Sequence, residues 1–337
     1  MEPHLFDAKT SNGTEPGIEN RSERIGLGLA SLGRPAYLTS GRSRDIGSDR
    51  SVSAMRQRTA DVLDTAYRTG IRYFDVARSY GRAEEFLTDW LTKRPEVTDA
   101  VVASKWGYRY VGDWRIDAAE HEVRDHTLEA FETQLEETTA LLARWLRLYQ
   151  VHSVTDDSPV LSDTRLQCAL ADLRDQGVQV GLSTSGPSQS TVIRAALGIE
   201  VGGAPLFSSV QSTWNLLETS AAEALSEAQE AGMAVVIKEC FANGRLAPGT
   251  SDSSPVVTLA VKVAAELHIG LDQLAIAAAV HQPWASRSLS GAVTAAQIES
   301  HVEAASVELP AGMLAELTTL GEEPREYWAT RSRRLWC

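Results

Sequence analysis

Four ionisable side chains in the first half of the sequence could together reduce a carbonyl group. They are Asp75, Tyr80, Lys105 and His152, and each ends or follows a short apolar run. A tyrosine is a poor acid at neutral pH, because its pKa is about 10, but a nearby ammonium group lowers that pKa by favouring the phenolate. Lys105 provides this cation, and Asp75 can hold it charged and oriented. His152 can then position a carbonyl oxygen while Tyr80 delivers a proton as hydride reaches the carbon.

Each of these residues also has a purely structural explanation. An aspartate after an apolar strand often caps the next helix, and a lysine at a strand end can be a solvated charge. A single histidine is more often a satisfied buried side chain than a catalytic group. Their occurrence together at successive strand ends is harder to explain by packing, so we expect them to form one site.

The elements that must position these residues are short apolar runs that alternate with longer amphipathic segments. We predict strands over Ile25–Ala30, Ile71–Val76, Ala100–Ser104, Leu146–His152, Val178–Ser183, Ser208–Gln211, Ala234–Ile237 and Ser288–Ala292. We predict helices over Ala54–Thr69, Glu84–Lys93, Arg124–Leu142, Arg165–Gln176, Gln189–Leu197, Ser220–Ala231 and Val256–His281, the last broken near Gly270. This alternation predicts βαβ units with parallel strands.

Eight such strands are the number that closes a (β/α)8 barrel, the α/β fold also called a TIM barrel. Gly70, Gly177 and Gly232 directly precede strands, as expected of glycines that end helices. Active residues of such a barrel lie at the C-terminal ends of its strands, which is where the four ionisable residues stand. A doubly wound open sheet is the main structural alternative.

The 337 residues are enough for about two domains, but one α/β barrel fills the same length. We expect a flexible N-terminal arm over residues 1–23, a barrel over 24–323 and a C-terminal tail over 324–337. The tail carries four arginines and two tryptophans, and it could pack back on the barrel, form an interface or be solvated. Two polar segments, Arg34–Arg50 and Asn243–Pro255, are predicted as long loops, which are often functional.

Composition narrows the classes of partner. The chain has 45 acidic and 32 basic residues, a formal net charge of -13. Such a surface repels phosphate backbones and anionic membranes, so we expect no nucleic-acid and no membrane partner. Three cysteines, no secretory signal and no apolar run of about 20 residues predict a cytoplasmic protein without disulfides. The cysteine spacing matches no zinc pattern, so no metal site is expected, and an oligomer remains possible.

A series of short motifs resembles the aldo-keto reductase superfamily over roughly Arg24 to Glu308. The motifs are Gly70-Ile71-Arg72-Tyr73-Phe74-Asp75, Ser79-Tyr80-Gly81, Ala103-Ser104-Lys105, Tyr149-Gln150-Val151-His152, Gly181-Leu182-Ser183, Gln211-Ser212-Thr213-Trp214-Asn215-Leu216-Leu217, Asn243-Gly244-Arg245-Leu246 and Ser290-Gly291-Ala292 with Gln297. The resemblance implies a (β/α)8 barrel and nicotinamide-dependent reduction of an aldehyde or ketone, with a sugar-derived compound as one compatible substrate. It implies that Tyr80 is the acid, that Lys105 and Asp75 tune it, and that His152 orients the substrate.

The resemblance also implies which residues hold the cofactor. Ser183 and Gln211 would hydrogen-bond the nicotinamide carboxamide, and the segment with Gly244 and Arg245 would contact the pyrophosphate. The segment Gly291–Gln297 would lie beside the adenosine ribose. The full set of expected cofactor-binding residues is Ser183, Thr184, Gln211, Lys238, Gly244, Arg245, Gly291, Thr294 and Gln297.

The sequence departs from the superfamily pattern in three places. Thr184 replaces an asparagine and lacks its amide. Lys238, one of only five lysines, stands where the superfamily usually stacks a tyrosine on the nicotinamide ring. Our hypothesis is that its alkyl stem packs on the ring or its ammonium lies near a phosphate, and the alternative is a charge pair with Glu239 at the rim. Val293 and Thr294 stand where NADP-preferring relatives often carry an arginine, so NAD(H) stays open. The general preference of the superfamily nevertheless favours NADP(H).

Aromatic residues after Lys105 could form a wall for the substrate, although ordinary loop packing explains them equally well. They are Trp106, Tyr108 and Trp114. Two other functions stay open. Lysines at barrel strand ends can condense with carbonyl compounds, so a Schiff-base lyase would use Lys105 or Lys238. A non-catalytic regulatory subunit that binds the cofactor is the other alternative, because the superfamily includes such members.

Overall fold

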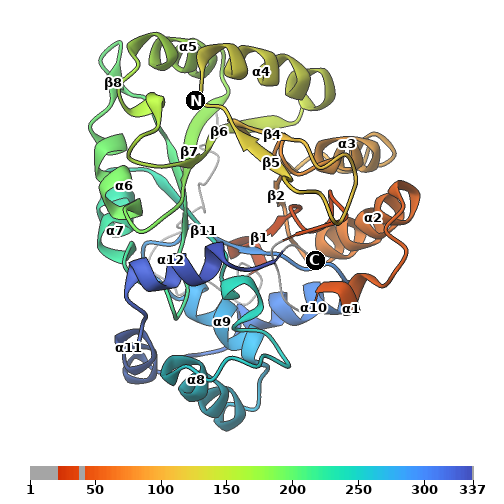
Figure 1. Ribbon diagram of the computed structural model, residues 1–337, viewed down its shortest axis with the longest axis vertical. Helices are drawn as coiled ribbons and strands as arrows, with labels where there is room; N and C mark the ends of the chain where they lie inside the picture. Colours follow the sequence, from red (N-terminus) through yellow and green to blue (C-terminus); the bar gives the residue numbers. More distant parts are fainter. Residues whose placement is uncertain (1–21, 38–41, 336–337) are drawn as a thin grey trace.

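Eight parallel strands close into a barrel in the computed structural model, which describes residues 22–37 and 42–335 (Figure 1). The strands are β1 (Ile25–Gly28), β2 (Tyr73–Asp75), β3 (Val101–Trp106), β6 (Leu146–Val154), β7 (Gln179–Thr184), β10 (Ser209–Thr213), β11 (Ala234–Lys238) and β12 (Arg287–Ser290). The barrel closes where β1 pairs in parallel with both β2 and β12. The predicted (β/α)8 barrel is confirmed, and its closure excludes the doubly wound open sheet.

Helices surround the barrel on its outside (Figure 1). They are α1 (Arg42–Ile46), α2 (Val52–Arg68), α3 (Ala83–Thr92), α4 (Leu128–Leu142), α5 (Thr164–Asp175), α6 (Gln189–Leu197), α7 (Ala222–Glu230), α8 (Pro255–Glu266), α9 (Leu271–Val280), α10 (Ala295–Ala304), α11 (Ala311–Thr319) and α12 (Pro324–Ser332). Short 3-10 turns are η2 (Ser22–Arg24), η3 (Pro159–Leu161) and η4 (Ala242–Gly244). Helix α10 packs against α2, so the last strand–helix unit meets the first.

The predicted helices all form, with some changes at their ends. The segment predicted as one helix over Val256–His281 is two helices, α8 and α9, with a bend of 97° between them. Helix α4 begins at Leu128 rather than at Arg124, because Glu122–Arg124 pairs as strand β5. Helices α1, α10, α11 and α12 were not predicted, and α1 lies within the segment Arg34–Arg50 that was predicted as a loop. Helices α10 and α12 carry few large apolar residues that could mark a helical period. In the described part of the chain, no helix alone is long and apolar enough to cross a membrane, and α8 and α9 meet that test only as a bent pair.

Local signals in the sequence set the helix ends. The side chains of Ser51, Thr127 and Asp163 accept hydrogen bonds from backbone N–H groups in the first turns of α2, α4 and α5. Gly70 and Gly177 follow α2 and α5 with φ angles of 97° and 93°, a left-handed conformation that glycine adopts without strain. The chain can therefore reverse directly into the next strand at these points.

Alternation along the barrel strands decides which side chains face the interior. A small buried cluster, separate from the main core under the helices, is formed by Tyr73, Ala103, Leu148, Val236 and Leu289 of five different strands. Side chains repeat on one face with a period of two. Asp75, Lys105 and Lys238 lie two positions after cluster members, so they face the same interior one layer nearer the C-terminal ends.

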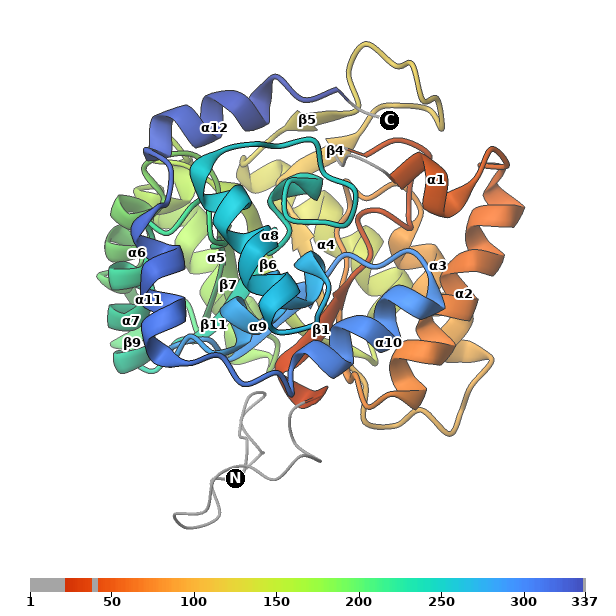
Figure 2. The same cartoon turned by 90° about the horizontal axis from the view of Figure 1, so that it is seen from below.

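Two segments cover these C-terminal ends, at the top of Figure 2. One is the antiparallel hairpin of β4 (Tyr108–Tyr110) and β5 (Glu122–Arg124). The other is α12, in which Tyr327 and Trp328 are buried. The small hairpin of β8 (Glu200–Val201) and β9 (Ala204–Pro205) is the remaining sheet of the described chain. The C-terminal segment therefore packs back on the barrel through α12, which was one of the three alternatives considered from the sequence. Most of the predicted N-terminal arm, residues 1–23, lies outside the described residues.

Candidate active site

Lys105 and Asp75 form a buried ion pair inside the barrel mouth. Lys105 Nζ donates to Asp75 Oδ1 at 2.5 Å and to the Val76 carbonyl oxygen at 3.0 Å. Gln211 Nε2 donates to the other carboxylate oxygen of Asp75 at 2.8 Å. Burial lowers the pKa of Lys105, and the Asp75 carboxylate opposes that shift. From the sequence, Gln211 was expected to hydrogen-bond the nicotinamide carboxamide. In the structure, its side-chain amide holds the Asp75 carboxylate in place.

Tyr80 lies directly above this pair, in the loop after β2. Its ring centroid is 4.7 Å from Lys105 Nζ and 5.4 Å from the His152 ring, which meets it edge to face. Burial, and then the negative charge of Asp75, raise the pKa of Tyr80 well above its usual value. This direction is opposite to the one expected from Lys105 alone, because the cost of burying a phenolate outweighs the attraction of the cation. The phenol is therefore fully protonated at neutral pH and can act as a proton donor.

His152 is held as a neutral imidazole. Its Nδ1 lies 3.3 Å from Ser79 Oγ, and its backbone carbonyl oxygen is bonded to His126 Nε2 at 2.8 Å. Burial and the nearby ammonium groups of Lys105 and Lys238 lower the pKa of His152 well below its usual value. A neutral imidazole carries one N–H, so His152 can donate one hydrogen bond to a substrate oxygen or to Ser79, depending on the tautomer.

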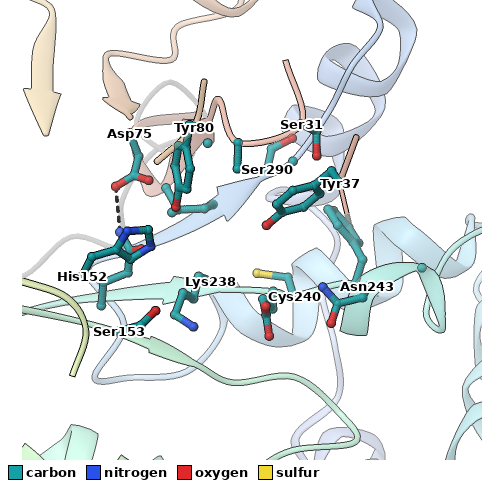
Figure 3. A pocket seen from close by; sticks show the side chains of 18 of the residues that line it. Ser31, Tyr37, Asp75, Tyr80, His152, Ser153, Lys238, Cys240, Asn243 and Ser290 are labelled. Atoms are coloured by element: carbon teal, nitrogen blue, oxygen red, sulfur yellow. Dashed lines mark hydrogen bonds between the residues drawn. The ribbon is translucent and has the colours of Figure 1, made fainter. Parts of the chain in front are cut away.

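These side chains meet at a cavity of about 200 Å³, here called the mouth cavity. Figure 3 shows Tyr80, His152 and Lys238 facing the same space from three different elements. Of the residues expected from the sequence, the mouth cavity is lined by Asp75, Tyr80, His152, Gln211, Lys238, Gly244 and Gly291. Lys105 does not line the mouth cavity, but it contacts two residues that do, Asp75 and Tyr80.

Lys238 ends β11 and faces the mouth cavity. Its Nζ donates to Thr213 Oγ1 at 2.9 Å, and burial lowers its pKa to about 8. Glu239 turns away into a left-handed conformation with φ 58° and pairs instead with Arg331 of α12. Of the charge pair between Lys238 and Glu239 considered from the sequence, the described structure shows no direct ion pair, because Arg331 binds the carboxylate, although the charge of Glu239 still acts on Lys238.

Arg34 is a residue of the mouth cavity that the sequence reasoning missed. Its side chain is 2% exposed, its Nη1 donates to the Ser79 carbonyl oxygen at 3.0 Å and pairs with Glu122 at 2.7 Å. Its Cζ lies 5.5 Å from the Tyr80 ring centroid. The only sequence signal was its place at the start of a long loop after the first strand, because its partners are distant in sequence. Glu122 and Arg331 were missed for the same reason, as was the pairing of Glu239 with Arg331.

A second cavity of about 220 Å³, here called the side cavity, adjoins the first. The two cavities share four lining residues, Ser31, Phe241, Gly244 and Gly291. Gln297 lines the side cavity, and its Nε2 donates to Asp45 Oδ2 at 2.8 Å. Arg44 lies beside them on α1. The chain thus offers one continuous channel from Tyr80 to Gln297.

Two of the expected cofactor residues on β7 lie behind the mouth cavity. Ser183 Oγ accepts a hydrogen bond from Ser153 N at 2.8 Å, which fixes the turn after His152. Thr184 Oγ1 lies 2.7 Å from Ser212 Oγ in a fully buried polar network. Neither is among the residues that line the two cavities.

Arg245 and Thr294 are occupied by bonds within the protein. Arg245 Nε pairs with Asp252 at 2.5 Å, and its other nitrogens pair with Glu322. Thr294 caps α10, because its hydroxyl accepts a bond from Gln297 N at 3.2 Å. Arg245 lines a separate surface hollow that Gly244 also borders. Neither Arg245 nor Thr294 lines the mouth cavity or the side cavity.

Of the three aromatic residues considered as a substrate wall, Tyr108 comes closest to the site. Its ring lies 5.2 Å from the His152 ring. Trp106 is fully buried, and Trp114 Nε1 donates to the Arg50 carbonyl oxygen at 2.8 Å. Ordinary packing therefore accounts for the two tryptophans.

A barrel of this kind with these residues matches a known family. A sequence model described as the Aldo/keto reductase family matches residues 24–322. The chain belongs to the aldo/keto reductase family. Within this family it is an oxidoreductase enzyme. Aldo/keto reductases generally use nicotinamide cofactors.

Known relatives agree with this assignment. The chain is 27% identical over 302 residues to Protein tas of Escherichia coli (strain K12), with 76% of this chain and 86% of the relative covered. It shares its fold with the holo form of aldo-keto reductase AKR11C1 from Bacillus halodurans, with a TM-score of 0.67, 21% identity, and 89% and 92% of the two chains covered. The glycerol dehydrogenase AKR11B4 from Gluconobacter oxydans has a TM-score of 0.65, 18% identity, and 88% and 90% covered.

The junction of the two cavities leaves room for a ligand such as a nicotinamide dinucleotide. At their junction, a Cβ added to Gly291 would meet no heavy atom within 4 Å, so the backbone there is open to a ligand. The side cavity reaches Val293 and Gln297 at the start of α10, and helix N-termini favour phosphate groups. The channel joins this helix N-terminus to Tyr80, and the side cavity there is lined by one cation, Arg44, and by the carboxylates of Asp45 and Asp272.

Proposed function

We propose that this enzyme reduces an aldehyde or ketone to an alcohol and that Tyr80 donates the proton. The observation that carries the proposal is the set of contacts around the Tyr80 ring, with Lys105 Nζ at 4.7 Å and the His152 ring at 5.4 Å. A carbonyl oxygen in the mouth cavity would lie within reach of the phenol and the imidazole, since both line it. A general acid of this kind contributes about 10²–10⁴-fold.

Each buried partner has a role in that proton transfer. When Tyr80 gives up its proton, a phenolate is left in a site where burial disfavours charge. The Lys105 ammonium stabilises that phenolate, and Asp75 holds the ammonium in place through the 2.5 Å bond. His152, neutral because of burial, donates to the carbonyl oxygen and sets its direction.

A bound nicotinamide would supply the hydride. Gly244 and Gly291, at the junction of the cavities, and Gln297 in the side cavity are the residues that we propose to hold the cofactor. NADP(H) is the cofactor that we propose first, with Arg44 as a partner for a 2′-phosphate. NAD(H) is the alternative, supported by the Asp45 carboxylate in the same cavity, which suits a 2′-hydroxyl.

A Schiff-base lyase is the second candidate, because Lys238 places an amine of lowered pKa in the mouth cavity. Lys105 suits that chemistry less, since its ammonium is already bonded to Asp75 and to a backbone carbonyl. Treatment with borohydride in the presence of a carbonyl compound would trap a covalent adduct on Lys238. An adduct that forms without any reduced nicotinamide would favour the lyase.

The deciding experiment is a turnover assay with a panel of aldehydes and ketones. We expect loss of the absorbance of reduced cofactor with at least one compound, and a different rate with NADPH and NADH. No turnover with either cofactor across the panel would overturn the proposal.

The family model matches residues 24–322. This match supports our proposal that residues 24–323 form a single catalytic domain.

A further inference from the structure

The charged groups around the mouth cavity are almost all arranged in pairs. Lys105 bonds Asp75 at 2.5 Å, Arg34 bonds Glu122 at 2.7 Å and Arg331 bonds Glu239 at 2.5 Å. Each of these cations therefore has its own carboxylate within hydrogen-bond distance. Their charges are largely neutralised before any substrate arrives.

Lys238 is different from these three cations. Its Nζ donates to the neutral hydroxyl of Thr213 at 2.9 Å, and no carboxylate of the described chain lies within ion-pair distance of it. The neighbouring Glu239 forms a two-point ion pair with Arg331, so it acts on Lys238 through its charge and through the shared Thr213 hydroxyl rather than by a direct ion pair. The ammonium has three N–H donors, so donors remain for a ligand in the cavity.

Lys238 lies in the mouth cavity, at the end of the channel where the substrate is proposed to bind. Figure 3 shows Lys238 and Ser153 on the same side of the cavity as His152, with Asn243 on the far side. The channel leaves toward the side cavity past Gly244 and Gly291. Burial, and then the positive charges of Lys105 and Lys238, lower the pKa of His152, so the charge of Lys238 acts on the residue that faces the substrate carbonyl.

We propose that Lys238 is a specificity-determining residue that binds a carboxylate group of the substrate. The inference rests on the proposed carbonyl reduction and names its substrate class, which is aldehydes and ketones that also carry a carboxylate. Lys238, His152 and Tyr80 all line the mouth cavity, so such a molecule can be held at its acid group by Lys238 and at its carbonyl oxygen by His152 and Tyr80. A charge-assisted hydrogen bond in a partly buried site is stronger than a neutral one, so an uncharged analogue loses affinity.

The test compares matched pairs of aldehydes in the wild type, K238M, K238R and the control K262M. The acids are glyoxylate, succinic semialdehyde and 4-carboxybenzaldehyde, and the neutral partners are methyl glyoxylate, butyraldehyde and 4-methylbenzaldehyde. Lys262 is an exposed lysine on α8, so K262M removes the same charge from the surface. For at least one pair we expect K238M to lower kcat/KM for the acid about 10-fold to 100-fold, mainly through KM, and to change the neutral aldehyde less than about 3-fold. We expect K238R to retain most of the preference and K262M to retain all of it.

Two further measurements separate this inference from the proposed function. Calorimetric binding of 4-(hydroxymethyl)benzoate, the alcohol expected from 4-carboxybenzaldehyde, requires no turnover and should weaken about 10-fold or more in K238M. Binding of NADPH and NADH, followed by fluorescence, should be unchanged. Equal losses for acids and neutral aldehydes, or weakened cofactor binding in K238M, would overturn the inference and place Lys238 against the cofactor. Absence of turnover with every aldehyde, with the carboxylate still bound through Lys238, would overturn the proposed reduction alone.

Discussion

Arg331 and Glu239 form a two-point ion pair that joins the C-terminal helix α12 to the end of barrel strand β11. Arg331 Nε lies 3.0 Å from both carboxylate oxygens of Glu239, and Nη2 lies 2.5 Å from Oε1. The two residues are 92 positions apart in the sequence. The same carboxylate also accepts a bond from Thr213 at 3.2 Å, so the pair is part of the wall of the mouth cavity.

Replacing Arg331 by methionine should destabilise the protein. The Glu239 side chain is 7% exposed and would be left as an uncompensated carboxylate, whereas Arg331 is 26% exposed and water can partly replace it. We expect a loss of about 1–3 kcal/mol in the free energy of unfolding, less than for a fully buried pair. Urea denaturation measures it, with R325M on the exposed face of α12 as the control. Equal midpoints for R331M and R325M would contradict the expectation.

Glu239 should make stability depend on pH in the acid range. Arg331 and Lys238 hold the pKa of Glu239 at about 2 against burial, compared with an ordinary value of 4.5. A carboxylate with a lowered pKa in the folded state stabilises that state above the ordinary pKa, and this stabilisation is lost as the pH falls toward the folded-state value. Denaturation at several pH values from 6 down to about 2.5 should therefore show a steeper loss in the wild type than in E239Q. Parallel curves for the two proteins would show that Glu239 does not contribute.

Removing the Tyr80 hydroxyl should abolish most turnover. In Y80F the ring contacts to Lys105 and His152 can remain, but the proton donor is gone. We expect kcat to fall by about 10²–10⁴-fold with cofactor affinity within about 2-fold of the wild type. Y67F, which removes a tyrosine hydroxyl bonded to Asp99 on the outside of the barrel, is the control. Y80F with nearly full activity would exclude Tyr80 as the acid.

The activity should show no histidine titration near neutral pH. Burial and nearby cations hold the pKa of His152 well below 6.5, so its imidazole stays neutral throughout the range in which an exposed histidine titrates. We expect kcat/KM to be flat from about pH 5.5 to 7.5. H152Q keeps an N–H donor and H152L has none, so H152L should be the weaker enzyme by about 10-fold or more. An inflection near pH 6.5 that disappears in both variants would show that His152 is charged in the working enzyme.

A side chain added at Gly291 should block the cofactor channel without disturbing the fold. Gly291 lies at the junction of the two cavities, and an added Cβ meets no protein atom within 4 Å. We expect G291V to fold normally and to bind reduced nicotinamide cofactors about 10-fold or more weakly, a loss of about 1.4 kcal/mol or more. G312V, at an equally open glycine on α11, is the control. Undiminished cofactor affinity in G291V would place the cofactor elsewhere.

The sequence was sufficient to predict the barrel and to predict that Asp75, Tyr80, Lys105 and His152 lie close together. Parallel strands buried on both faces leave a strong apolar pattern, and Asp75 and Lys105 stand at strand ends, where the barrel brings them together. Arg34 and Arg331 could not be predicted, because they reach the site from a loop and from a terminal helix through ion pairs over long sequence distances. The direction of the Tyr80 pKa also required the structure, since burial outweighs the cation that the sequence brings beside it.

The family match ends at residue 322, and α12 follows it at Pro324–Ser332. The reactive groups on the strands and the helix that covers them are thus encoded by separate stretches of the gene. Substitutions in α12 therefore change the wall of the mouth cavity at Arg331 without changing the strand ends that carry Asp75 and Lys105.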